Sequence, residues 1–364
     1  MYWCAMIGKK SDLLRASKPA EFVATFIEPM KKRVSRMTKL SEMNDQAARR
    51  FVFVLVDGFT LLSFAGAVDA LRIANRASGK KLYDWVILSE DGGEVTSSAG
   101  PSFLADGALE ELRRDDTLVL VSGVDVQSNC STKLLNWLRR ESRRGVRIAG
   151  LCTAAHILAK TGLLNDKRAT IHWENHDSFS EEFDEVELTK RVFVVDGKIM
   201  TAAGGTAAID LILKIIAEDQ GEDVANVVAD QQIYTTIRTE SDSQRLSVPT
   251  RIGVRHPKLS DVIRKMEANI EEPISPSVLA SEVGMSTRQL ERLFRRYLNR
   301  SPKRYYMELR LQKARNLLMQ TDMSVINVAL SCGFSSPSHF SKCYRSHYDT
   351  TPYRERGSRG ARPA

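Results

Sequence analysis

The 364-residue chain is poor in cysteine, with five in total, and none of them stands in the closely spaced pairs of zinc sites or small disulfide frameworks. This usage favours a reducing compartment, so we expect a cytoplasmic protein. Long apolar runs are also missing: none approaches the roughly 18 to 20 residues that span a bilayer, and no membrane partner is expected. The opening MYWCAMIGKK places its apolar residues before its positive charges, the reverse of a secretory signal. Nothing in the sequence predicts a metal site or a cofactor.

Acidic residues are scarce in the last third of the chain. Residues 251–364 hold 21 Lys and Arg against 10 Asp and Glu, a net charge of +11, whereas residues 51–250 hold 21 against 30. A basic segment joined to an acidic one indicates a domain for a polyanion beside a domain with another task.

Residues 51–238 alternate short β-branched runs, such as FVFVLVDG and TLVLVSG, with stretches of helical period. This alternation predicts an α/β domain with a largely parallel, flavodoxin-like sheet covered on both faces. RVFVVDGKIMTAAGG predicts a hairpin that turns at Asp196-Gly197. We expect residues 1–50 to be a poorly ordered extension, in which Met1 and Met37 both stand as possible starts, and residues 239–257 to be a linker.

Residues 258–355 carry a repeat within a predicted all-α domain, followed by a basic tail at 356–364. LASEVGMSTRQLERLFRRYLNRSP and VALSCGFSSPSHFSKCYRSHYDTTP share an Ala-to-Gly spacing of four, an apolar pair four apart and an aromatic-to-Pro spacing of eight. In each copy a glycine ends one helix and a serine, Ser286 in the first and Ser335 or Ser336 in the second, caps the next. Each copy is therefore a predicted helix-turn-helix, and SPKRYYMELRLQKARNLLMQ is the predicted helix between them.

These last hundred residues resemble the AraC/XylS family of transcription regulators, and GFSSPSHFSKCYRSHYDTTPYRER is similar to that family's signature over its full length. The resemblance implies double-stranded operator DNA as a partner. Pro337 departs from the polar residue often found there, and we expect it to open the helix without reading a base. The predicted DNA-contacting residues are Thr287, Arg288, Glu291, Arg292, Arg295, Lys303, Arg304, Ser336, Ser338, Ser341, Lys342 and Arg345.

Cys152 stands where the strand RIAGL meets a helix, the kind of turn on which enzymes mount nucleophiles. The segments DGFTLLSFAGAVDALRIANR, GLCTAAHILAKTGLL, RATIHWE and AAGGTAAIDL make the α/β domain similar to the PfpI-like, class I glutamine amidotransferase-like fold. Fused to AraC-type helices, it resembles the GlxA family of regulators. In enzymes of this fold a histidine activates the cysteine and a glutamate often accompanies it. Here Ser63 stands at the acidic position, and His172 is a lone base, so we expect Cys152 to be a pocket wall.

The predicted pocket suits a small zwitterion. The first N–H groups of the helix after Cys152, including that of Thr153, are suited to a carboxylate, and Trp173 beside Glu174 and His172 is suited to an alkyl ammonium group. Regulators of glycine betaine, carnitine and arginine catabolism share this architecture, which implies the same ligand class. The predicted effector-binding residues are Phe59, Ser63, Ser122, Gly123, Cys152, Thr153, His172 and Trp173.

We therefore expect a ligand-responsive transcription regulator without enzymatic activity, an activator of a catabolic operon. It is expected to dimerise through the PfpI-like domain and to act on RNA polymerase. Two alternatives stay open: a PfpI-like cysteine amidase or peptidase with a DNA-binding domain, and an architectural DNA binder that senses nothing. The operator sequence, the identity of the effector and the sign of regulation do not follow from the sequence.

Overall fold

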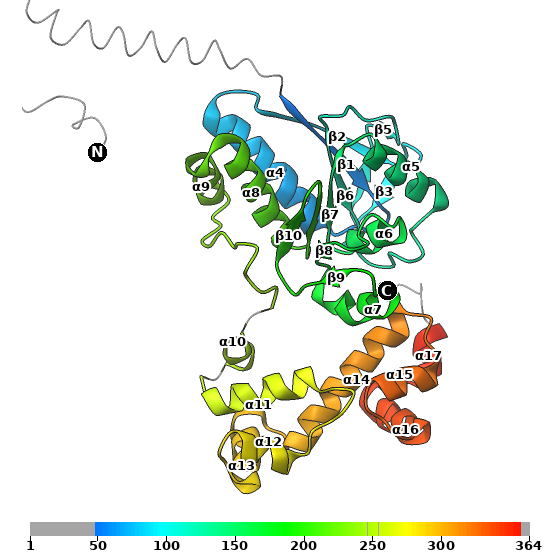
Figure 1. Ribbon diagram of the computed structural model, residues 1–364, viewed down its shortest axis with the longest axis vertical. Helices are drawn as coiled ribbons and strands as arrows, with labels where there is room; N and C mark the ends of the chain where they lie inside the picture. The colour runs from blue at the N-terminus through cyan, green and yellow to red at the C-terminus, as the bar shows by residue number, and fades with distance from the viewer. Residues whose placement is uncertain (1–47, 246, 254, 358–364) are drawn as a thin grey trace, which may run out of the picture. The chain divides into compact units, whose positions relative to one another are not determined.

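The computed structural model describes residues 48–245, 247–253 and 255–357. Its N-terminal part is built on a seven-stranded sheet in the order β10-β11-β7-β6-β1-β2-β5 (Figure 1). All neighbouring strands pair in parallel except β10 with β11. The strands are β1 (Arg49–Leu55), β2 (Tyr83–Ser89), β5 (Gly107–Ala108), β6 (Thr117–Val121), β7 (Arg147–Leu151), β10 (Phe193–Asp196) and β11 (Ile199–Ala202). This confirms the predicted α/β fold with its largely parallel sheet.

Side chains of β1 alternate between two cores, one on each face of the sheet. Phe51, Phe53 and Leu55 pack in the core beneath helices α4 (Leu61–Ser78), α8 (Ala207–Gln220) and α9 (Glu222–Gln231). Val52 and Val54 pack on the opposite face with α5 (Thr132–Arg143), α6 (Ala154–Lys160) and α7 (His176–Glu182). A strand buried on both sides has to be apolar throughout, which explains the unbroken run FVFVLV.

The hairpin predicted at Asp196-Gly197 joins β10 to β11, and Gly197 has a φ of +59°. Smaller strand pairs lie outside the main sheet: β3 (Glu94–Thr96) with β4 (Ser102–Leu104), and β8 (Arg168–Ala169) with β9 (Glu187–Leu188). A short 3-10 helix, Trp173–Asn175, precedes α7. The carboxyl ends of β1, β6 and β7 meet at one edge of the sheet, where a parallel α/β fold places its ligand crevice.

The C-terminal part is helical. The two predicted helix-turn-helix units are α12 (Pro276–Glu282) with α13 (Thr287–Leu298), and α15 (Val325–Ser331) with α16 (Pro337–Tyr348). The long helix α14 (Pro302–Gln320) connects them. Helices α10 (Val248–Ile252) and α11 (Pro257–Ala268) precede the first unit, and α17 (Pro352–Gly357) follows the second. Two separate apolar cores, one per unit, show that each unit packs around its own centre.

Several sequence-based expectations fall on residues beyond this description. The predicted N-terminal extension at 1–50, with the choice between Met1 and Met37, lies outside the described residues as far as residue 47. The predicted basic tail lies outside them after Gly357.

Candidate effector site and nucleic-acid interface

Cys152 occupies a sharp turn between β7 and α6. Its φ is +63°, an uncommon conformation for a residue with a Cβ atom, and its backbone N–H donates to the carbonyl of Ala202 at 2.9 Å. Gly204 lies directly against this turn: a Cβ atom on Gly204 would stand 2.6 Å from the Cβ of Cys152, closer than real contacts allow. The predicted strand–turn–helix is present, and its tight packing fixes the direction of the thiol.

The thiol is surrounded by neutral donors. The Thr60 hydroxyl donates to Sγ at 3.2 Å, and the backbone N–H of Thr153 also bonds to the cysteine. Burial raises the pKa of the Cys152 thiol, although these two hydrogen bonds oppose the change. Among the described residues no histidine contacts the sulfur by a hydrogen bond. Burial of the thiol favours its protonated form over the nucleophilic thiolate. Thr60 carries no sequence pattern that would have singled it out.

Ser122, Gly123 and Thr153 lie around the same turn, and Ser63 of α4 lies beside it at the position where the resemblance places an acidic residue. The Ser63 hydroxyl accepts from the backbone N–H of Gly205 at 2.8 Å, so a neutral group fills the acidic position. Thr153 Oγ1 donates to the carbonyl of Gly123 at 2.6 Å and lies 3.1 Å from Ser122 Oγ. All three hydroxyls are buried and bonded within the protein. The side chains that brace the elbow at these positions are therefore neutral hydroxyl groups.

Phe59 has a different position from the one expected of a ligand-facing aromatic. Its ring is fully buried and packs edge-on against Phe64 and Phe103, with both centroid distances 5.7 Å. The backbone of Phe59 bridges to Gly123 and Ser97. Packing against an apolar core stabilises this ring more than exposure in a crevice would, so Phe59 shapes the loop and offers no open face.

His172 and Trp173 lie on the loop that follows β8. Trp173 is 39% exposed, and Nδ1 of His172 lies 3.8 Å from a carboxylate oxygen of Glu174. Burial lowers the pKa of His172, while the Glu174 charge opposes the shift. The negative charge of Glu174 also contributes to the raised pKa of Cys152, so this loop acts electrostatically on the elbow. An anionic and an aromatic group therefore accompany the N–H groups of the turn.

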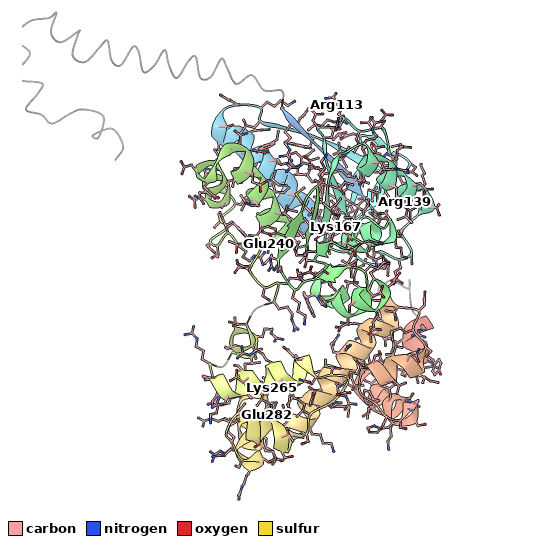
Figure 2. The ribbon with its side chains drawn as sticks, viewed as in Figure 1. Arg113, Arg139, Lys167, Glu240, Lys265 and Glu282 are labelled. Atoms are coloured by element: carbon pink, nitrogen blue, oxygen red, sulfur yellow. The ribbon has the colours of Figure 1, made fainter. Side chains whose placement is uncertain are left out.

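Residues that follow the domain cover the face of Trp173. The guanidinium carbon of Arg245 lies 4.5 Å from the Trp173 ring centroid, within cation–π distance. Gln244 Nε2 lies within hydrogen-bond distance of the carbonyls of Ile171, at 2.9 Å, and Arg191, at 3.0 Å. The Glu240 carboxylate, labelled in Figure 2, pairs with Arg168 and Arg191. Residues 240–245 of the predicted linker are thus bound to the α/β domain next to residues 170–174, the segment with His172 and Trp173 that we call the effector loop. The polar sequence of residues 240–245 does not predict these contacts, because the bonds of Gln244 go to backbone carbonyls, which are the same at every position.

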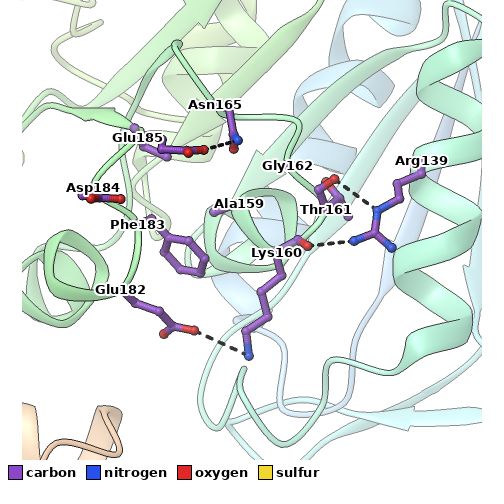
Figure 3. A pocket seen from close by; sticks show the side chains of 11 residues that line it. Arg139, Ala159, Lys160, Thr161, Gly162, Asn165, Glu182, Phe183, Asp184 and Glu185 are labelled. Atoms are coloured by element: carbon purple, nitrogen blue, oxygen red, sulfur yellow. Dashed lines mark hydrogen bonds and ion pairs between the residues drawn. The ribbon is translucent and has the colours of Figure 1, made fainter.

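A polar hollow of about 430 Å³ lies beside α6 and the segment after α7 (Figure 3). Its cations are engaged within the protein: Lys160 lies 3.8 Å from Glu182, and Arg139 donates to the carbonyls of Thr161 and Lys160. None of the eight predicted effector residues lines this hollow. With its cations already engaged, it is a weaker candidate for an anionic ligand than the elbow.

His156, four residues after Cys152, is a packed histidine. It is 5% exposed, meets Phe183 edge-on at a centroid distance of 5.1 Å, and leaves Nε2 buried without a hydrogen-bond partner. Burial lowers its pKa to about 3. The Glu182 carboxylate, 3.8 Å from Nδ1, is too far for a hydrogen bond and does not reverse the shift.

This shift predicts a loss of stability in acid. The unfolded chain binds a proton on His156 below about pH 6.5 and the folded chain does not, so the free energy of unfolding falls as the pH drops from 6.5 toward 3. The slope from this group is about 1.4 kcal/mol per pH unit. We expect His156→Leu to remove that slope in denaturant titrations at pH 4 to 7. Parallel curves for the two proteins would contradict a neutral, buried His156.

The two helix-turn-helix units have the predicted local chemistry. Gly284 and Gly333 end the first helix of each unit at φ values of +62° and +73°. Ser286 caps α13 with a complete capping box to Gln289, and Ser336, rather than Ser335, caps α16. Pro337 stands in the first turn of α16, as predicted. The glycines and caps thus determine where both recognition helices begin.

The predicted DNA-contacting side chains on the recognition helices are open to solvent on one face. Leu290 and Phe294 are fully buried beneath α13, and Phe340 and Tyr344 beneath α16. Exposed residues are Thr287, Arg288, Glu291, Arg292, Arg295, Lys303, Arg304, Ser338, Lys342 and Arg345, whereas Ser336 and Ser341 are half-buried. Arg304 differs from the other cations because it pairs with Glu308 at 3.1 Å, a turn further along α14. In the described part of the chain, none of Arg288, Arg292 and Arg295 has an ion-pair partner, which leaves their guanidinium groups available to DNA.

Arg310 was not singled out by the sequence, yet it joins α14 to the second unit. Its Nε donates to the carbonyl of Cys332 and its Nη2 to that of Gly333, at 2.8 and 2.7 Å, and its guanidinium lies over Phe334. Gly333 in turn approaches the backbone of Ile270, where a Cβ atom would stand 2.6 Å from the carbonyl oxygen. These contacts fix the second unit on the helix that also carries the first.

Within the described residues, no helix combines the length and apolar character that crossing a membrane requires. The same residues contain no group of three or more His, Cys, Asp or Glu side chains arranged to hold a metal ion.

The chain thus joins an α/β domain, with a cysteine at the turn after β7, to a helical part with two helix-turn-helix units, the architecture of a DNA-binding protein with a second domain. Residues 49–218 match the DJ-1/PfpI family, and residues 279–358 match a helix-turn-helix domain family. The chain is 45% identical over 306 residues to the HTH-type transcriptional regulator CdhR of Pseudomonas aeruginosa, covering 84% of this chain and 91% of that protein.

It is also 37% identical over 305 residues to the HTH-type transcriptional regulator GlxA of Rhizobium meliloti, covering 84% and 94%. A crystal structure of an AraC family transcriptional regulator from Pseudomonas putida is 28% identical, covers 50% of this chain and 99% of that one, and has a TM-score of 0.46. The chain belongs to the family of HTH-type transcriptional regulators that includes CdhR and GlxA, with a DJ-1/PfpI domain and an AraC-type DNA-binding domain.

Proposed function

We propose that this regulator senses a small zwitterionic amine of the betaine, carnitine or amino-acid kind at the Cys152 elbow, without enzymatic turnover. The observation that carries the proposal is the contact between Trp173 and Arg245, because it ties the effector loop to the chain that leads to the DNA-binding helices. A ligand carboxylate would meet N–H groups at the turn, and its ammonium would meet Trp173 and Glu174.

Arg245 occupies the place of the ligand's cation on the indole face. An ammonium group that takes this face competes with the guanidinium and releases Arg245 from Trp173. The effector therefore binds better to the state in which Arg245 has left the indole than to the state in which it covers the indole. A ligand shifts an equilibrium between two states only through such a difference in affinity. Binding at the elbow is thereby read out at the start of the DNA-binding part of the chain.

The proposal extends to assembly and output: a cytoplasmic homodimer formed through the DJ-1/PfpI domain that activates a catabolic operon by contacting RNA polymerase. Three exposed apolar side chains, Leu62, Leu104 and Val124, support an interface on this domain. They belong to neighbouring segments, because Phe59 packs on Phe103 and Gly58 lies against Val124. Exposed apolar groups of this kind favour association.

Calorimetry of the full-length protein with glycine betaine, carnitine and a panel of amino acids tests the sensor. Heat of binding without product formation supports it, and turnover of an amide or peptide supports a cysteine hydrolase. The strained φ of Cys152 is the one observation that favours the hydrolase, since nucleophiles stand on such turns. Silence toward every compound would contradict both.

Cys152→Ala is expected to leave DNA affinity within about 0.5 kcal/mol of the parent, since a neutral thiol in a braced turn does no chemistry. The variant keeps the backbone conformation and removes only Sγ. Amidase and peptidase assays should give background rates for both proteins. A hydrolytic rate in the parent that the variant lacks would show that Cys152 is a nucleophile.

A further inference from the structure

A second hollow lies outside the elbow, between the short helix α10 and the start of α11, with a volume of about 480 Å³. Its lining includes several side chains that donate hydrogen bonds, and among the described residues that line it there is no Asp or Glu. The polar lining consists of Ser247, Thr250, Arg255, His256, Ser260 and Arg264. A hollow with donors on several sides and no lining carboxylate is suited to an anion.

Ser260 contributes a buried, unpaired hydroxyl to this hollow. The residue is 2% exposed, and its hydroxyl is buried with no hydrogen-bond partner among the described residues. Its backbone is satisfied, because the N–H donates to the carbonyl of His256 at 3.0 Å. Buried hydroxyls are almost always paired, so the Ser260 hydroxyl offers a hydrogen bond to a group that enters the hollow.

The other donors are oriented by bonds that leave a hydrogen free. His256 caps α11 by accepting from the backbone N–H of Leu259 through Nδ1 at 3.3 Å, so its ring hydrogen is on Nε2. The hydroxyls of Ser247 and Thr250 lie 2.9 Å apart, and only one of their two hydrogens is used between them. Arg255 has no ion-pair partner in the described part of the chain, whereas Arg264 pairs with Asp261. The free guanidinium of Arg255 supplies the charge.

We propose that this hollow binds a phosphate group, and that the backbone of DNA beside the first recognition helix provides it. A tetrahedral phosphate accepts from more directions than a planar carboxylate, which fits donors on two helices and the segment between them. The hollow lies beside the first helix-turn-helix unit. Lys258 Nζ donates to the carbonyl of Gly284, in the turn between α12 and α13, and the ring of His256 lies 6.1 Å from that of Tyr297 on α13.

The test measures DNA affinity of the full-length protein between about 50 and 200 mM salt, with Arg255→Gln and Ser260→Ala. Arg255→Gln is expected to lower the salt slope by about one unit. Ser260→Ala is expected to cost about tenfold in affinity while the melting temperature stays level or rises, because it deletes an unpaired hydroxyl. Arg113→Gln, an equal charge change at an exposed position in the α/β domain, is the matched control and keeps the parent slope.

Inorganic phosphate distinguishes the two sources of the group. The parent and both variants are melted in potassium phosphate and in potassium chloride of equal ionic strength. Unchanged DNA slopes together with a phosphate-dependent rise in melting temperature, seen in the parent and lost in the variants, would assign the hollow to a free phosphate-bearing ligand. If DNA slope and melting temperature are both indifferent to the substitutions and to phosphate, the proposed site does not exist.

Discussion

Replacing Arg292 by alanine is expected to weaken binding to the operator by about 1–3 kcal/mol and to relax the preference at one base position. Arg292 is exposed on α13, opposite the buried Leu290 and Phe294, and has no ion-pair partner among the described residues. A planar guanidinium in that position can form two parallel bonds to guanine. The measurement is a binding titration against operator and scrambled DNA at several salt concentrations.

Arg304→Ala is the companion variant. Arg304 begins α14 and pairs with Glu308, so it reaches a phosphate only by giving up that ion pair. Its loss is expected to weaken binding to operator and scrambled DNA alike and to lower the salt slope by about one unit. If Arg292→Ala also weakens both DNAs equally, Arg292 contacts the backbone and reads no base.

Trp173→Ala is expected to reduce effector affinity by about 1–2 kcal/mol, the range for an ammonium on a partly desolvated aromatic face. The side chain is 39% exposed, so its removal should leave the fold intact and DNA affinity of the ligand-free protein measurable. Isothermal calorimetry with the tightest-binding amine from the panel gives the difference directly.

Arg245→Ala is expected to act in the opposite direction. Removing the guanidinium from the indole frees the face for the ligand, and apparent affinity should rise by about 1 kcal/mol because the ligand no longer competes with Arg245. Arg113→Ala, an equal charge change at an exposed position of the α/β domain, is the control. An affinity that falls in Arg245→Ala would mean that Arg245 binds the effector itself, and the competition model would fail.

Local patterns were sufficient to predict the helix-turn-helix units. The glycine of each copy has a left-handed conformation that few other residues adopt at low cost, and the serine after it caps the next helix, so the turns at Gly284 and Gly333 follow from neighbours in sequence. The alternation of apolar strands with helices likewise predicted the parallel sheet. The meeting of Ser122 and Cys152 at one edge followed from the rule that parallel strands end together.

The sequence by itself therefore determined the two domain types, the turn at Cys152 and the recognition helices α13 and α16, because each depends on periodicity or on a turn of a few residues. Only the tertiary structure decided that the Phe59 ring is buried, that Arg245 lies over the ring of Trp173 and that Arg310 donates to the carbonyl of Gly333. These three facts depend on contacts between residues far apart in the chain or on bonds to backbone carbonyls. Backbone carbonyls are chemically alike at every position, so the pattern of side chains does not predict which carbonyl a distant arginine binds.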